Sequence, residues 1–125
     1  MIVPTRPRVL IVDDNPGVVR ALGRALSLDC DVVGVITDGS DVADAAARLW
    51  PVVLVVDVNL PNVNGLDVCR QITQSNPRAK VIMISAMTDD EIRREALEGG
   101  ASGFFHKSAA DELIAAIRRI WTEST

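Results

Sequence analysis

Three aspartates, a serine and a lysine stand where they could carry out phosphoryl chemistry. Asp13 and Asp14 directly follow one short apolar run, Asp57 follows another, and Ser85 and Lys107 follow two more. Three carboxylates in one place repel one another by a few kcal/mol per close pair at an effective dielectric of ~20, so they require a cation. A divalent ion, with Lys107 as a second positive charge, leaves a pocket near neutrality that can accept a phosphoryl dianion.

The ligand types at this predicted site favour Mg²⁺, with Mn²⁺ as an alternative. Mg²⁺ prefers carboxylate and carbonyl oxygens and keeps several waters, so it needs few protein ligands. Zinc is disfavoured because no histidine or cysteine is expected beside the aspartates. We therefore expect Asp13, Asp14 and Asp57 to contribute to a magnesium site.

Short apolar runs, many of them rich in β-branched residues, alternate with helix-length amphipathic segments. This pattern predicts five strands, at residues 9–12, 31–36, 52–56, 81–84 and 103–105. The run at residues 52–56 is apolar without a break, which is typical of a central parallel strand covered by helices on both faces.

Five helices are expected because each segment after a strand has an N-terminal start signal followed by apolar residues at helical spacing. A glycine pair predicts the end of the fourth helix. The start signals are Asn15 with Pro16, Asp38 or Ser40 before Val42, Asn64 before Leu66, Thr88 with Glu91, and Ser108 before Leu113; the glycine pair is Gly99 and Gly100.

Strict alternation of strands and helices with short connections predicts right-handed crossovers and an α/β, doubly wound parallel sheet. We expect one domain over residues 1–125, with its core at about residues 8–122. For a flavodoxin-like strand order of 2-1-3-4-5, ligands bind at the carboxyl ends of strands one and three. The five polar residues described above follow those ends and the neighbouring ones.

Four segments resemble the receiver domain of response regulators. They are V-D-D-N-P at residues 12–16, D-V-N-L-P-N-V-N-G at 57–65, I-S-A at 84–86 and G-F-F-H-K at 103–107. The resemblance implies that Asp57 is the phosphoacceptor and takes a phosphoryl group from the histidine of a sensor kinase or from a small phosphodonor. Such a domain is not an enzyme in the usual sense, since it catalyses only its own phosphorylation and dephosphorylation.

The resemblance also implies roles around the metal and the phosphoryl group. Asp14 would bind Mg²⁺ directly, Asp13 largely through water, and Asn59 through its backbone carbonyl. Lys107 and the hydroxyl of Ser85 would each contact a phosphoryl oxygen.

The same resemblance implies a switch. Movement of Ser85 toward the phosphoryl group would change the rotamer of Phe104 and reshape the face made by the fourth helix, the fifth strand and the fifth helix. Asn59 and Met87 occupy positions that influence hydrolysis of the aspartyl phosphate in this family. Phe104 could instead be a core residue only.

One departure from the family pattern is Ser108, which follows Lys107 where family members often have proline. A cis bond without proline costs about 3 to 4 kcal/mol, so we expect the Lys107–Ser108 bond to be trans. His106 is the single histidine, and we interpret it as a structural or surface residue.

Two rival functions remain open from the sequence. A phosphatase of the haloacid dehalogenase type also uses an aspartate beside Mg²⁺, but it needs a second acidic residue two positions on, where this chain has Asn59. A receiver-shaped module that works by protein contacts alone is the other alternative. Taken singly, Asp13 and Asp14 could be turn or cap residues, and Asp57 could cap a loop.

Composition bears on partners and location. A formal net charge of -4 is unlike a nucleic-acid-binding footprint, and no targeting or membrane segment is recognised, so we expect a cytoplasmic protein. Cys30 and Cys69 are expected to be reduced core residues.

The ending L-I-A-A-I-R-R-I-W resembles receivers that precede a helix-turn-helix output domain in regulators of the nitrate-response (NarL/FixJ) type. The alternative is a single-domain regulator that acts on another protein or passes phosphate to a phosphotransfer domain. The sequence does not decide whether phosphorylation drives homodimer formation.

Overall fold

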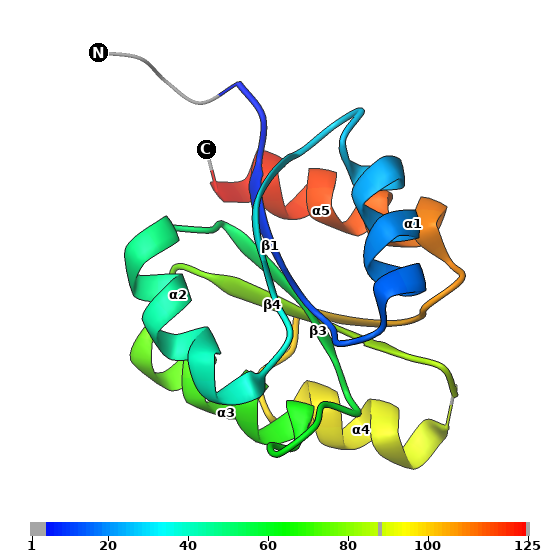
Figure 1. Ribbon diagram of the computed structural model, residues 1–125. Helices are drawn as coiled ribbons and strands as arrows, with labels where there is room; N and C mark the ends of the chain where they lie inside the picture. Colours follow the sequence, from blue (N-terminus) through cyan, green and yellow to red (C-terminus); the bar gives the residue numbers. More distant parts are fainter. Residues whose placement is uncertain (1–4, 88, 125) are drawn as a thin grey trace.

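The computed structural model describes residues 5–87 and 89–124, in which five strands alternate with five helices (Figure 1). The elements are β1 (Arg8–Val12), α1 (Pro16–Leu26), β2 (Asp31–Ile36), the short 3₁₀ helix η1 (Gly39–Asp41), α2 (Val42–Leu49), β3 (Val53–Asp57), α3 (Gly65–Ser75), β4 (Lys80–Ser85), α4 (Asp90–Glu98), β5 (Gly103–His106) and α5 (Ala110–Ser124).

The strands form one parallel sheet in the order β2-β1-β3-β4-β5. The predicted doubly wound, flavodoxin-like fold is confirmed. Strand order reverses at β1, which pairs with β2 on one side and with β3 on the other. This arrangement brings the carboxyl ends of β1 and β3 together at the predicted switch point.

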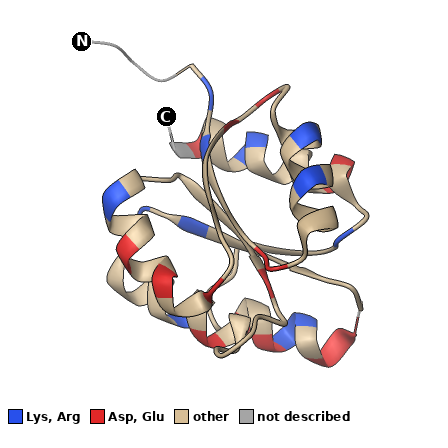
Figure 2. Cartoon of the chain, viewed as in Figure 1, with Lys and Arg blue, Asp and Glu red and all other residues tan. Residues whose placement is uncertain are grey.

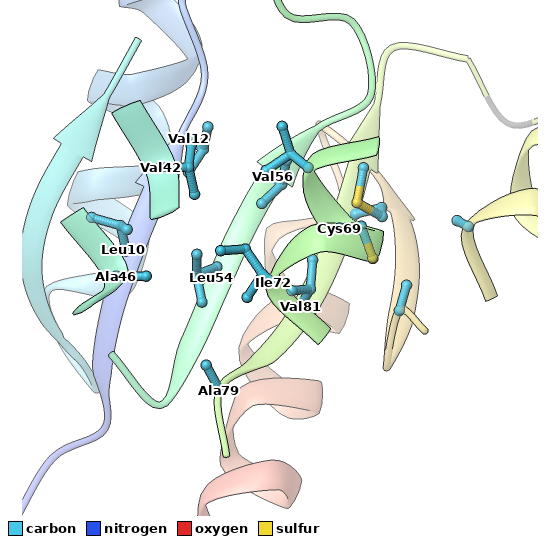
Figure 3. Packing of buried hydrophobic residues seen from close by; sticks show 14 of the residues in the cluster. Leu10, Val12, Val42, Ala46, Leu54, Val56, Cys69, Ile72, Ala79 and Val81 are labelled. Atoms are coloured by element: carbon cyan, nitrogen blue, oxygen red, sulfur yellow. The ribbon is translucent and has the colours of Figure 1, made fainter. Parts of the chain in front are cut away.

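Helices cover both faces of the sheet, with α1 and α5 on one face and α2, α3 and α4 on the other (Figure 1). Alternate residues of each strand point to opposite faces, so β1 places Val9 and Ile11 in one core and Leu10 and Val12 in the other. Figure 3 shows the second core, where side chains from β1 and β3 meet those of α2 and α3.

The helix starts follow the expected signals in part. The Asn15 side chain accepts hydrogen bonds from the N–H groups of Gly17 and Val18, and the Asn64 side chain accepts one from Leu66. Asp38 accepts one from Ser40 and therefore caps η1, which leads directly into α2.

The fourth and fifth helices begin at Asp90 and Ala110. The cap of α4 is Asp89, whose carboxylate accepts from the Glu91 N–H, while Thr88, the predicted start, lies outside the described residues. The predicted fifth helix is present, but it begins at Ala110, two residues after Ser108, so Ser108 is not its N-cap. The hydroxyl of Ser108 contacts the ring of His106 instead.

Helix ends and buried thiols agree with expectation. Gly99 is the C-cap of α4, and Gly100 has a φ of 104°, which a residue with a Cβ atom rarely adopts. Cys30 and Cys69 are free and buried. No helix in the described part of the chain is both long and apolar enough to cross a membrane.

The two tryptophans lie at the far ends of their helices. Trp50 ends α2 in the left-handed region, with a φ of 55°, and its side chain is exposed. Trp121 lies near the end of α5 and is half-buried.

Candidate functional site

The predicted carboxylates meet at the carboxyl edge of the sheet. Asp57 is the last residue of β3, and Asp13 and Asp14 directly follow β1, which lies beside it. One ligand atom from each of the three residues lies within 4.8 Å of the others. Figure 2 shows acidic segments where β1 and β3 leave the sheet.

Local turns fix how the two buried carboxylates point. Asp13 is fully buried and Asp57 is 2% exposed, whereas Asp14 is exposed. The Oδ1 atom of Asp13 accepts a hydrogen bond of 2.8 Å from the Asn15 N–H, and Oδ1 of Asp57 accepts one of 3.0 Å from the Asn59 N–H. Each carboxylate thus uses one oxygen to close its own turn and keeps Oδ2 for the site.

Lys107 supplies the cation between these oxygens. Its Nζ atom lies 3.0 Å from Oδ2 of Asp57 and 3.1 Å from Oδ2 of Asp13. The lysine follows β5, and its backbone N–H donates a 2.9 Å hydrogen bond to the carbonyl of Ser85. The peptide bond from Lys107 to Ser108 is trans as predicted, since the described residues contain no cis bond.

Burial and charge shift two pKa values in the site. Burial raises the pKa of Asp57 above its usual range, and the negative charge of Asp13 acts in the same direction; the hydrogen bonds from Lys107 and Asn59 only partly oppose this. Burial lowers the pKa of Lys107, but its hydrogen bond to Asp57 and the negative charges of Asp57 and Asp13 outweigh this and raise that pKa.

Oδ2 of Asp13 is the buried side-chain oxygen that lacks a hydrogen bond among the described residues. The ammonium of Lys107 lies 3.1 Å away, close enough for charge attraction but without hydrogen-bond alignment. Lys107 brings one positive charge to two buried carboxylates, so a further cation would offset the negative charge that remains. The cluster therefore fits a hard divalent ion held by oxygen ligands.

The chain after β3 folds tightly back onto the site. The N–H of Gly65 donates a 3.0 Å hydrogen bond to the carbonyl of Val58, and an isolated bridge joins Asn59 to Asn64. A Cβ atom on Gly65 would lie 2.0 Å from the carbonyl oxygen of Asp57, so only glycine fits. The same segment, residues 58–64, lines an open hollow of about 510 Å³.

Ser85 and Phe104 are both buried near this edge. The Oγ atom of Ser85 accepts a 3.1 Å hydrogen bond from the N–H of Met87, whose side chain is exposed. Phe104 is 1% exposed, and the guanidinium of Arg93 in α4 lies 5.2 Å from its ring centroid. Stacking of this kind joins α4 to β5 through a cation–π contact.

Sequence reasoning missed three contacts beside the site. The Nε2 atom of His106 lies 3.0 Å from the carbonyl oxygen of Ala86, and Nδ1 lies 2.6 Å from Oγ of Ser108. The contact of Arg93 with Phe104 was also not foreseen. The contacts of His106 with Ala86 and of Arg93 with Phe104 depend on how separate segments meet, and the contact of His106 with Ser108 depends on the local turn. Residue spacing therefore signals none of the three.

Comparison with known proteins identifies the family. Residues 9–118 match the model of the response regulator receiver domain. The chain is 34% identical over 118 residues to the response regulator GacA of Pseudomonas protegens, covering 91% of this chain and 55% of that protein. It is 32% identical over 116 residues to the transcriptional regulatory protein LnrK of Bacillus subtilis, covering 90% and 53%.

Solved structures agree. The receiver domain of the response regulator NarL from Mycobacterium tuberculosis superimposes with a TM-score of 0.86 at 30% identity, covering 93% of this chain and 96% of that one. A LuxR-family regulator from Aurantimonas gives a TM-score of 0.88 at 27% identity, covering 95% and 87%. The chain spans about half the length of the curated relatives named above. With its family match, fold and acidic cluster in agreement, this chain belongs to the response regulator receiver domain family of two-component signal transduction.

Proposed function

We propose that Asp57 is the phosphoacceptor of this receiver and that Mg²⁺ is required for its phosphorylation. The observation that carries the proposal is the meeting of Asp13, Asp14 and Asp57 within 4.8 Å, with Lys107 bound to the two buried carboxylates. A carboxylate oxygen of Asp57 attacks phosphorus, and the bond from phosphorus to the donor's leaving atom breaks on the opposite side. The product is a mixed carboxylic–phosphoric anhydride.

Mg²⁺ would be held by the carboxylates of Asp13, Asp14 and Asp57 and by the backbone carbonyl of Asn59. When bound, the ion supplies positive charge that offsets the carboxylates and the incoming phosphoryl oxygens. The exposed position of Asp14 and the unsatisfied Oδ2 of Asp13 support this ligand set. Mn²⁺ has similar oxygen preferences and would substitute for Mg²⁺.

Lys107 and Ser85 stabilise the product in this proposal. Lys107 already lies against Asp57, so its ammonium can pair with a phosphoryl oxygen after only a short movement. Ser85 is buried at the end of β4, and its hydroxyl would leave its contact with Met87 to donate to another phosphoryl oxygen.

Phe104 would report this movement to the surface. Its ring is buried beneath Arg93 in the unphosphorylated arrangement, and inward movement of Ser85 would let the ring change rotamer. The face of α4, β5 and α5 would then differ between the two states. Asn59 and Met87 have exposed side chains beside the site, which suits a role in the rate of anhydride hydrolysis.

The phosphodonor would be a sensor histidine kinase or a phosphotransfer domain, and the chain would catalyse only its own phosphorylation and dephosphorylation. Residues 1–125 would form one receiver domain. A helix-turn-helix output domain outside this chain is the proposed target, supported by the half-length coverage of relatives and the likeness to a LuxR-family regulator. Homodimer formation on phosphorylation would fit such an output.

Acetyl phosphate tests the phosphoacceptor directly. The parent, an Asp57→Asn variant and an Asp67→Asn control are incubated with acetyl phosphate, with and without Mg²⁺, and intact masses are recorded at short times. Asp67 is an exposed aspartate of α3 that pairs with Arg70. We expect one added phosphoryl group only with Mg²⁺, in the parent and the control but not in Asp57→Asn.

Other outcomes would contradict the proposal. A folded parent that gains no phosphoryl group would favour the module that works by protein contacts alone. Equal phosphorylation of Asp57→Asn would place the acceptor elsewhere. Steady turnover of a phosphate ester would instead indicate a phosphatase.

A further inference from the structure

His106 connects the two loops that carry the proposed phosphoryl-binding groups. Its Nδ1 atom lies 2.6 Å from Oγ and 3.1 Å from the backbone N of Ser108, and its Nε2 atom lies 3.0 Å from the carbonyl oxygen of Ala86. Ala86 directly follows Ser85, and Ser108 directly follows Lys107. The imidazole of His106 thus contacts Ala86, which is next to Ser85, and Ser108, which is next to Lys107.

The contacts define the protonation of the ring. A backbone N–H can only donate, so Nδ1 must accept from Ser108 and carries no proton. In the neutral ring the proton is then on Nε2, which donates to the carbonyl of Ala86. Both ring nitrogens are engaged, so neither is available as a base or a phosphoryl acceptor.

The ring bond adds to the pairing of β4 with β5. Ser85 pairs with His106 in the sheet, and the Lys107 N–H donates to the Ser85 carbonyl at 2.9 Å. The bond from His106 to Ala86 continues this connection one residue past the end of β4. The turn over residues 85–87 is therefore held from within by the contact of Met87 with Ser85, and from outside by the imidazole.

We propose that His106 is a positioning residue that holds the Ser85–Met87 turn in its unphosphorylated position. This inference rests on the proposed function, in which the Ser85 hydroxyl moves to a phosphoryl oxygen. Ala86 is covalently joined to Ser85 and moves with it, which breaks the bond to the ring. A bond present in one state and absent in the other shifts the equilibrium toward the first state.

Substitution of the ring tests this. His106→Leu removes the donor to Ala86, whereas His106→Gln keeps an N–H donor on a side chain of similar reach. The readout is the affinity of the Mg²⁺-loaded protein for beryllium trifluoride, a mimic of the phosphoryl group. A neutral hydrogen bond lost from one state predicts about 3- to 10-fold tighter binding by His106→Leu. His106→Gln should stay within about twofold of the parent on the same basis.

A second measurement does not depend on phosphoryl binding. In the unliganded parent, nitrogen NMR of the imidazole should show a protonated Nε2 and an unprotonated Nδ1. Amide hydrogen exchange at Met87 should be faster in His106→Leu than in the parent.

Ser108→Ala, which keeps the backbone donor but loses the hydroxyl, should bind beryllium trifluoride with an affinity between those of the parent and His106→Leu.

The outcomes separate the two proposals. Urea denaturation first establishes that each variant is folded, and Ser108→Ala serves if His106→Leu is not. In one outcome the parent binds beryllium trifluoride while His106→Leu and Ser108→Ala bind it no more tightly. This result overturns the role of His106 and leaves the phosphoacceptor proposal intact. A parent that neither binds the mimic nor gains phosphate overturns both. Weaker binding by His106→Leu shows that the ring favours the phosphorylated position, which also contradicts the inference.

Discussion

At the scale of single residues, the two buried carboxylates of the site repel each other. Asp13 and Asp57 share the ammonium of Lys107, which is one positive charge for two negative ones. The raised pKa of Asp57 means that folding favours its protonated form, so its ionised form lowers stability near neutral pH. Neutralising this one side chain should relieve the repulsion while Lys107 keeps Asp13 as its partner.

We therefore predict that Asp57→Asn raises the free energy of unfolding by about 1–2 kcal/mol at pH 7.5 without Mg²⁺. The gain should shrink as the pH falls through the raised pKa of Asp57 toward the ordinary aspartate value, because the parent carboxyl then becomes neutral too. Urea denaturation at a series of pH values measures the difference. A constant difference across this range would show that shape, not charge, causes the change.

Five site residues could be placed from the sequence because each lies at or just after the end of a strand, and parallel strands end at one edge. They are Asp13, Asp14, Asp57, Ser85 and Lys107. The side-chain contacts in the site could not be predicted in this way. The contact of the Lys107 ammonium with two carboxylates depends on the rotamer of Lys107, and the ring contacts of His106 depend on loop conformation. Neither the rotamer nor the loop conformation can be read from the order of residues along the chain.

At the scale of elements, the start of α3 is fitted to the end of β3. We predict that Gly65→Ala destabilises the fold by about 2–3 kcal/mol, because the new Cβ would lie 2.0 Å from the carbonyl oxygen of Asp57 and the turn must shift. Phosphorylation by acetyl phosphate should also slow, since the same shift moves Asp57. Urea denaturation and the rate of mass gain measure the two effects.

A matched control lies in α1. A Cβ atom on Gly23 would meet nothing within 4 Å, so Gly23→Ala should stabilise the fold by about 0.5–1 kcal/mol and leave the phosphorylation rate unchanged. Equal effects of the two substitutions would mean that the close approach at Gly65 is not important for the site.

Two of the predicted helix starts are confirmed as side-chain caps. Asn15 and Asn64 cap their helices as their spacing indicates. Ser108 does not cap α5, because the ring of His106 competes for its hydroxyl and the helix begins at Ala110. His106 and Ser108 are only two residues apart, but the ring rotamer that brings them together is not part of the helix-start pattern.

At the scale of the whole molecule, two cores share one sheet. Cys30 lies in the core beneath α1 and α5, and Cys69 in the core beneath α2, α3 and α4. Burial raises the pKa of each thiol to about 11, so neither should react in the folded protein at pH 8. Each thiol therefore reports the opening of its own face.

We predict that both cysteines become reactive at the same urea concentration. β1, β3 and β4 contribute alternate residues to the two cores, so one face cannot lose its packing without disturbing the other. Pulsed labelling with a thiol reagent, followed by mass analysis of the peptides, gives one midpoint per cysteine. Separate midpoints would show that the two faces unfold independently.

Strict alternation of apolar runs and amphipathic segments made the parallel sheet predictable, since parallel strands need crossover helices. The order of strands is a different matter. Several doubly wound orders obey the same handedness rule, so the alternation by itself does not select the order in which β1 lies between β2 and β3.

The places of the two tryptophans have a practical consequence for fluorescence measurements of the proposed phosphorylation. Trp50 ends α2, and Trp121 lies about 16 Å along α5 from its first residue, which is the end nearer the carboxylates. The chain has no tyrosine. Its intrinsic fluorescence therefore originates away from the aspartates, and an emission spectrum that stays constant is no sign of an inert protein. An indole introduced at the exposed Met87 would give an optical probe beside the chemistry.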